Sequence, residues 1–209
     1  MALDIYIQSL SANGKVLVRD LRVHCAPGQV VTLMGASGSG KSSLLAAVCG
    51  TLNHGLQFEG DVQLDGQSVA ALPCAQRRIG MLFQDDLLFA HMTVRENLLF
   101  AVPQGPTAQR QAAVQAALNE LGFTEMAQRS PSTLSGGQRA RVSLLRTLLA
   151  QPRALLLDEP FSKLDAALRQ QFREFVFAHA RQYALPTLLV THDAADIADA
   201  SAVIQLQHA

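Results

Sequence analysis

The sequence has no excess of charge of either sign, because 17 lysine and arginine residues balance 17 aspartate and glutamate residues. A neutral chain produces no long-range field that would attract nucleic acid or an acidic membrane surface. Charged residues are also scarce, at 16% of the chain, whereas hydrophobic residues reach 49%. We therefore expect no nucleic-acid partner, and we expect apolar surface patches of the kind that contact other proteins.

Long hydrophobic runs are absent as well. A membrane-spanning helix needs roughly 20 consecutive apolar residues, and the densest apolar stretch, Leu144 to Leu157, is interrupted by Arg146 and by Gln151-Pro152-Arg153. The N-terminal segment alternates and does not place an apolar block behind a basic region, so we expect no secretory signal. Only three cysteines occur, without paired metal-ligand spacing, which predicts structural thiols in the reducing cytoplasm.

Strand-like segments occupy both ends of the chain. Residues 3–7 alternate between apolar and polar as in a half-buried strand. Asp65-Gly66 is the expected turn of a small hairpin near residues 60–66. Further strands are expected near residues 21–25, 30–34, 79–83, 154–157 and 188–190, with helices after Ser42 and between the last two strands.

The middle of the chain has helical spacing instead, from about residue 93 to 150, with breaks at Pro103–Pro106 and at Pro131. This order predicts an α/β nucleotide-binding lobe formed by residues 1–84 and 152–209. A helical insertion, residues 85–151, interrupts the lobe. We find no internal repeat.

A glycine-rich segment follows the predicted strand at residues 30–34. It is Gly35-Ala36-Ser37-Gly38-Ser39-Gly40-Lys41-Ser42, continued by Ser43 and a helical pattern. Its glycines let backbone N–H groups and the helix N-terminus point at phosphate oxygens. Lys41 adds a positive charge at the β- and γ-phosphates, and the Ser42 hydroxyl is placed to ligate Mg²⁺. We expect this phosphate loop, residues 35–43, to bind a nucleotide, and an ordinary glycine-rich turn is the alternative.

Two adjacent carboxylates end the apolar run Leu155-Leu156-Leu157. At a magnesium-nucleotide site, Asp158 would hold the metal shell and Glu159 would orient and deprotonate the attacking water. A core strand followed by a polar turn is the alternative, which the phosphate loop upstream disfavours.

His192 follows the next apolar run, where ligand groups of a parallel sheet collect. We expect it to contact phosphate, although a lone histidine is more often structural.

A second glycine-containing loop, Leu134-Ser135-Gly136-Gly137-Gln138, is named here the signature loop. A serine at a helix start followed by glycines exposes N–H donors where the helix dipole favours an anion. One nucleotide site needs only one such loop, so the second serves another ligand or another subunit. A simple helix cap with flexible glycines is the alternative.

Taken in order, these motifs resemble those of the ATP-binding subunits of ABC transporters, and the resemblance extends along essentially the whole chain. It implies a P-loop NTPase fold with a mostly parallel sheet, an antiparallel β subdomain and a helical subdomain that carries the signature loop. The chain most resembles small bacterial importer subunits of the YnjD-like group. The matching elements are the phosphate loop (Walker A), Gln84 (Q-loop), Leu134–Gln138 (signature), Leu155–Glu159 (Walker B and catalytic glutamate), Ser162–Asp165 (D-loop) and His192 (switch).

The resemblance implies that two copies pair head to tail around two Mg²⁺·ATP. Ser135, Gly136, Gly137 and Gln138 of one copy, with Asp165, would then contact the ATP bound by the other. Gln84 would contact Mg²⁺ or the attacking water and connect the site to the helical subdomain. Phe83 to Phe89 would dock on an integral membrane permease. A periplasmic solute-binding protein would complete an importer, and the subunit would work on the inner face of the cell membrane.

The sequence departs from the family pattern in three places. Ser11-Ala12-Asn13-Gly14 stands where an aromatic residue usually stacks on adenine, and Tyr6 is the nearest substitute. Arg139-Ala140-Arg141-Val142 is a less usual continuation of the signature. We also expect no C-terminal regulatory domain of the kind found in many sugar importers. A non-transport cassette that regulates a membrane partner remains the main alternative, ahead of a DNA-repair ATPase and an adenylate-type kinase.

Overall fold

The computed structural model describes residues 1–36, 38–52 and 54–206, and these form two compact units. The first unit comprises the described residues of Met1–Met81, Arg153–Glu159 and the chain from Glu174 onward. The second comprises Leu82–Pro152 and Pro160–Arg173. The candidate nucleotide motifs are thus divided between two compact units.

A five-stranded sheet forms the centre of the first unit, in the order β6-β7-β8-β3-β9. The pairs β3–β8, β7–β8 and β3–β9 are parallel, as the α/β prediction requires. Its central strands are almost continuously buried because a parallel sheet is covered on both faces. The strands are β3 (Val30–Met34), β6 (Ile79–Leu82), β7 (Ala154–Asp158), β8 (Thr187–Thr191) and β9 (Val203–Gln205).

A separate antiparallel sheet, ordered β2-β1-β4-β5, completes the strands of this unit. The predicted hairpin is confirmed, with Asp65 and Gly66 at φ values of 53° and 75° in its turn, which glycine and aspartate tolerate. The prediction for the second strand was too short, since β2 begins at Lys15 and not near residue 21. The strands are β1 (Leu3–Ala12), β2 (Lys15–Cys25), β4 (Leu56–Leu64) and β5 (Gln67–Ser68).

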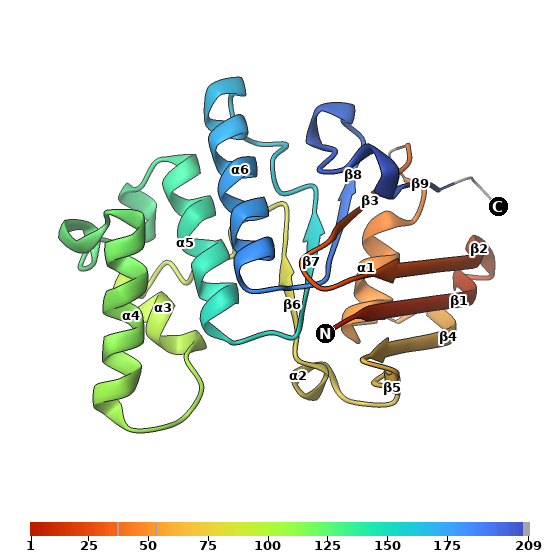
Figure 1. The fold of residues 1–209 in the computed structure, drawn as a ribbon, viewed down its shortest axis with the longest axis horizontal. Coiled ribbons are helices and arrows are strands. Elements are labelled where there is room, and N and C mark those ends of the chain that lie inside the picture. The colour runs from red at the N-terminus through yellow and green to blue at the C-terminus, as the bar shows by residue number, and fades with distance from the viewer. Residues whose placement is uncertain (37, 53, 207–209) are drawn as a thin grey trace. The chain divides into compact units, whose positions relative to one another are not determined.

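Two helices of the first unit follow strands directly. Helix α1 (Lys41–Cys49) begins in the phosphate loop and ends at Gly50, whose φ of 82° gives the left-handed cap that stops a helix. Its apolar residues Leu44, Leu45 and Val48 are fully buried, which confirms the predicted helix. The short α2 (Cys74–Arg77) precedes β6. Figure 1 shows α1 beside the strands of the first unit.

A buried arginine holds the end of α1. Arg77 is 7% exposed, and its guanidinium donates to the carbonyl oxygens of Ala47 (2.9 Å) and Val48 (2.8 Å) in the last turn of α1. It also donates to Leu72 and Ala70. A cation at a helix C-terminus satisfies carbonyls that lack an intrahelical partner and interacts favourably with the helix dipole.

Arg77→Met keeps much of the side-chain volume but removes all of these donors. We expect the free energy of unfolding to fall by about 2–4 kcal/mol, because several buried carbonyls lose their partners. Chemical denaturation measures this change. Arg19→Met, at an exposed position of β2, is the control and should change stability by less than about 0.5 kcal/mol. Equal stability of the two variants would contradict the role given to Arg77.

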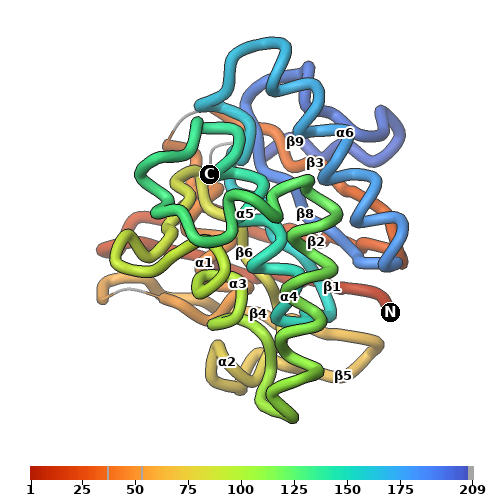
Figure 2. Tube along the Cα trace, turned by 90° about the vertical axis from the view of Figure 1, so that its left-hand side faces the viewer, coloured from red at the N-terminus to blue at the C-terminus, as the bar shows by residue number. Residues whose placement is uncertain are grey.

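The second unit is helical, as predicted for the middle of the chain. Figures 1 and 2 both show α3, α4 and α5 packed side by side. Breaks fall at the predicted prolines, before α4 and before α5. The helices are α3 (Val94–Ala101), α4 (Thr107–Leu121) and α5 (Gly136–Leu149), with α6 (Ala166–Gln182) beginning in this unit and ending in the first.

Short 3₁₀ turns connect these elements: Thr124–Met126, Pro131–Thr133, Ala194–Asp196 and Ala200–Ala202. Within the part of the chain that the structure describes, no helix combines the length and the apolarity needed to cross a bilayer.

Candidate functional site

The phosphate loop connects β3 to α1 in the first unit. Gly38 and Gly40 take φ values of 79° and 90°, a left-handed backbone that favours glycine. A Cβ on Gly35 would lie 2.8 Å from Ser39 Oγ, so the loop closes tightly on itself. Within the described part of the chain, the buried Ser39 hydroxyl has no hydrogen-bond partner. The loop therefore has the shape and polarity of an anion cradle, while Ser37 lies outside the described residues.

Lys41 lies over this loop and is only 5% exposed. Its Nζ donates to the carbonyl oxygens of Gly35 (2.9 Å) and Ala36 (2.8 Å) and lies 3.7 Å from Glu159 Oε1. A buried ammonium needs such partners, since desolvation of an unpaired charge is strongly unfavourable. The lysine is thus placed between the loop and the carboxylate that follows β7.

Ser42 and Asp158 bring two hard oxygen ligands together. Ser42 Oγ donates to Asp158 Oδ1 at 3.2 Å, close to the roughly 2.9 Å between adjacent ligands of an octahedral Mg²⁺. Burial raises the pKa of Asp158, and the charge of Glu159 raises it further, while the Ser42 hydrogen bond and Lys41 lower it. The described residues contain no cluster of three or more histidine, cysteine or acidic ligands. One hydroxyl and one carboxylate suit a cation that takes its other ligands from phosphate and water.

Glu159 stands at the end of β7 with a left-handed backbone, φ 45°, and its N–H donates to Val190 O at 3.0 Å. Its Oε2 lies 3.1 Å from His192 Nδ1, and the glutamate side chain is 20% exposed. An unfavourable φ in a non-glycine residue is often found where geometry serves function. The structure thus brings Lys41, Ser42, Asp158, Glu159 and His192 together at the carboxyl ends of the parallel strands, as predicted.

The signature loop lies in the second unit, at the start of α5. Ser135 Oγ accepts from Gln138 N at 3.3 Å, and Gln138 Oε1 accepts from Ser135 N at 2.9 Å. This capping box confirms the predicted helix start. The Ser135 hydroxyl proton and the N–H groups of Gly136 and Gly137 have no role in the box, so they are suited to bind an anion.

The two glycines of the signature loop differ in their surroundings. Gly136 is exposed, and a Cβ there would meet only Arg139 Nη2 at 3.9 Å. Gly137 is buried, and a Cβ there would lie 2.3 Å from Leu168 Cδ2. Gly136 therefore remains open to a ligand, whereas Gly137 is required for the close approach of α5 to the start of α6.

Gln84 and Asp165 also lie in the second unit. Gln84 Nε2 donates to Ser162 Oγ at 3.2 Å, which joins the residues after β6 to the segment before α6. Asp165 Oδ1 accepts from Leu168 N at 3.0 Å, so this exposed aspartate caps α6. An aspartate directly before a helix is a common N-cap, so this contact has a local sequence signal.

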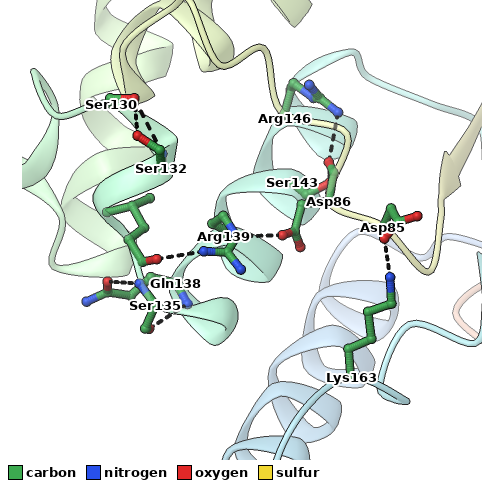
Figure 3. A network of polar contacts seen from close by, with 11 residues as sticks. Asp85, Asp86, Ser130, Ser132, Ser135, Gln138, Arg139, Ser143, Arg146 and Lys163 are labelled. Atoms are coloured by element: carbon green, nitrogen blue, oxygen red, sulfur yellow. Dashed lines mark hydrogen bonds and ion pairs between the residues drawn. The ribbon is translucent and has the colours of Figure 1, made fainter.

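Sequence reasoning did not find the polar contacts around Asp86, which Figure 3 shows together with the signature loop. Arg139 Nε donates to Asp86 Oδ2 at 2.9 Å, and Lys163 forms an ion pair with Asp85. Burial lowers the pKa of the Arg146 guanidinium, and the Asp86 carboxylate counteracts this effect. The two residues of each of these pairs are more than 50 residues apart in the sequence, so no local pattern predicts the contacts.

The structure does not identify, among the described residues, the side chain that would stack on the base. Tyr6 lies in the middle of β1, as predicted from its alternation, and Arg22 Cζ covers its ring at 5.0 Å from the centroid. Leu17 of β2 lies beside the phosphate loop, with its Cβ 3.0 Å from the position that a Cβ on Gly40 would take. The surface next to the loop is therefore aliphatic at this point.

Comparison with known proteins agrees with this arrangement. The model of the ABC transporter family matches residues 18–162. The chain is 50% identical over 180 residues to the Escherichia coli (strain K12) "Uncharacterized ABC transporter ATP-binding protein YnjD", which covers 86% of this chain and 83% of that protein. It is 42% identical over 179 residues to the thiamine import ATP-binding protein ThiQ of Vibrio vulnificus (strain YJ016), covering 85% and 74%.

A third relative is the aliphatic sulfonates import ATP-binding protein SsuB 1 of Xanthomonas axonopodis pv. citri (strain 306), 40% identical over 194 residues. The match covers 91% of this chain and 75% of that protein. The family match spans more than half of the chain and includes the phosphate loop, the signature loop and both carboxylates. The chain therefore belongs to the ABC transporter family, as one of its ATP-binding, ATP-hydrolysing subunits.

Proposed function

We propose that two copies of this chain pair head to tail around two Mg²⁺·ATP and drive import of a solute through a separate membrane permease. The proposal is based on one observation: the chain has a second anion-binding loop, the signature loop, which a single nucleotide site does not need. The backbone N–H groups of the phosphate loop and the Lys41 ammonium form one set of anion-binding groups in the first unit. The donors of Ser135 and Gly136 form a second set, at the start of α5. A head-to-tail pair uses both sets, because each ATP then meets the second set of the other copy.

Within the first unit, the phosphate loop would hold the β- and γ-phosphates through its backbone N–H groups and Lys41. Glu159 would accept the proton of the attacking water. His192, 3.1 Å from Glu159 Oε2, would keep that carboxylate oriented and contact the γ-phosphate. Most of the rate enhancement would come from positioning and from stabilisation of phosphoryl charge.

Ser42 and Asp158 would hold Mg²⁺, with Gln84 as a further oxygen ligand. When bound, the cation neutralises charge that develops on the phosphate oxygens. Asp165 would contact the ATP bound by the other copy, in addition to capping α6. These metal and nucleotide contacts are inferred from the oxygen donors and from the family resemblance.

The segment Phe83–Phe89, named here the coupling segment, would dock on the permease. Phe83 and Leu87 within it are 41% and 53% exposed, and Phe100 of α3 is 63% exposed. Exposed apolar side chains of this size suit a hydrophobic groove or helix of a partner. The subunit would thus work at the inner face of the cell membrane, and a periplasmic binding protein would deliver the solute.

Dilution tests the proposed pairing. If two copies form each site, specific ATPase activity falls in proportion to protein concentration below the dimer dissociation constant, because the active species is a dimer. Steady-state hydrolysis and mass photometry over the same dilution series measure this. ATP binding to the phosphate loop of the monomer is the control and should persist. Constant specific activity at concentrations where only monomer is present would contradict the pairing.

Transport of solute by the complex with the permease tests the remainder of the proposal. ATP-dependent solute accumulation in vesicles that contain the permease would support it. ATP hydrolysis that changes the permease without moving solute would favour a regulatory cassette instead.

A further inference from the structure

One face of α5 holds the coupling segment through three side chains. Arg139, Ser143 and Arg146 are four and three residues apart, which places them on the same helical face. Arg139 Nε donates to Asp86 Oδ2 at 2.9 Å, and Ser143 Oγ donates to Asp86 O at 2.8 Å. Arg146 Nη1 donates to Leu87 O at 2.8 Å. The contacts extend about 10 Å along the helix, so the segment is held along about half of the length of α5 (Figure 3).

The same arginine also reaches the signature loop. Arg139 Nη1 donates to Leu134 O at 2.7 Å, the carbonyl directly before the capping residue Ser135. One planar guanidinium therefore bonds the coupling segment with one edge and the signature loop with another, which its fixed fork of donors allows. Lysine has a single charged nitrogen and lacks this geometry.

The coupling segment itself is irregular and needs such support. Leu87 has a φ of 46°, which is unfavourable for a residue with a large side chain. Arg146 Cζ also lies 5.4 Å from the centroid of the Phe89 ring, so the far end of the segment packs on α5 as well. A shift of this segment would therefore be transmitted to α5, and with α5 to the donors at its first turn.

We propose that Asp86 and Arg139 are positioning residues for hydrolysis, which fix the donors of Ser135 and Gly136 in the orientation that the γ-phosphate of the partner copy requires. The proposal rests on the head-to-tail pairing described above. Neither side chain touches nucleotide in this role, and both act through the signature loop.

A purely structural role predicts that loss of the Asp86–Arg139 pair lowers turnover only by lowering folding stability. The Arg139 and Asp86 side chains are 37% and 28% exposed, and ion pairs with this much solvent access contribute little to folding stability. Loss of the pair should then leave the thermal midpoint nearly unchanged. A large fall in turnover without a fall in stability thus separates positioning from folding.

A double-mutant cycle with Asp86→Asn, Arg139→Gln and the double variant tests the proposal. We expect each single variant to lower kcat about tenfold with KM for ATP changed less than about twofold, and the double variant to be no worse than either single one. Arg139→Lys should resemble Arg139→Gln, because one ammonium nitrogen cannot occupy the two separate positions from which Nε and Nη1 donate. Asp86→Glu should recover most of the activity. Exposed Arg129 of the same unit provides the control, Arg129→Gln, with unchanged kcat.

Three results would overturn the inference: unchanged kcat in both single variants, multiplied defects in the double variant, or a defect that follows a lower thermal midpoint. Dimer formation on ATP binding is measured for every variant by mass photometry. If the wild-type protein hydrolyses ATP as a monomer, the pairing itself fails. If the wild type pairs and Asp86→Asn and Arg139→Gln both pair and hydrolyse normally, only the inference fails.

Discussion

Glu159→Gln is expected to bind ATP normally and to hydrolyse it roughly 10²- to 10⁴-fold more slowly than the wild type, the usual contribution of a general base. Glutamine has nearly the same shape as glutamate but cannot accept the proton of the attacking water. The structure places Glu159 between Lys41 Nζ, at 3.7 Å, and His192 Nδ1, at 3.1 Å. Replacement by the amide removes a negative charge next to the phosphate loop, so ATP affinity should be equal or higher.

Single-turnover hydrolysis and nucleotide binding measure the two effects separately. Because ATP then persists, the variant should accumulate as an ATP-bound dimer, visible by size-exclusion chromatography. Glu125→Gln makes the same chemical change at an exposed position of the second unit and should leave turnover unchanged. Wild-type turnover in Glu159→Gln would contradict the role of Glu159 as the general base. Another group would then have to accept the proton of the attacking water.

The elements around Glu159 were predictable because their signals are local. The runs that became β3 and β7 are short, apolar and bounded by turn residues. The glycine-rich loop between β3 and α1 needs left-handed backbone at Gly38 and Gly40, which glycine supplies at no steric penalty. Fixed spacing along the chain therefore determined both the elements and the side chains that they bring to the sheet edge.

Features that depend on distant partners were not predictable in the same way. The N-terminal half of β2 is formed by pairing with β1, for example Lys15 with Ala12 and Val18 with Leu10, and its own alternation is weak. Strand β9 has only three residues and is defined by its pairing with β3. Arg77 and Arg139 find their partners through tertiary structure, so sequence spacing could not assign them a role.

The choice of base is the least determined part of the site. Phosphate binding follows from the loop, but Ser11–Gly14 supplies no aromatic residue for the base, and the side chain beside Gly40 is the aliphatic Leu17. An aliphatic side chain offers less favourable stacking than an aromatic ring. Adenine specificity therefore depends on family membership more than on any contact that the structure shows.

Lys41→Ala and Ser135→Arg are each expected to reduce ATPase activity to below about 1% of wild type, and an equimolar mixture is expected to regain about a quarter of it. Lys41→Ala removes the ammonium that binds phosphate, whereas Ser135→Arg disrupts the signature loop and leaves the phosphate loop intact. In a head-to-tail pair of the two variants, one site combines both defects and the other combines neither. Random pairing makes about half of the dimers mixed, each with one intact site of two, which gives the quarter.

The mixing result distinguishes the two possible uses of the signature loop. If Ser135 served the nucleotide of its own chain, each chain of the mixture would still carry a complete defect and activity would stay at the level of the single variants. Mixing Lys41→Ala with Glu159→Gln is the matched control, because both changes lie in the first unit and on the same side of each site. In that mixture, each site contains one of the two defects, so activity should not return. Recovery in the control, or no recovery with Ser135→Arg, would contradict the assignment of the signature loop to the partner copy.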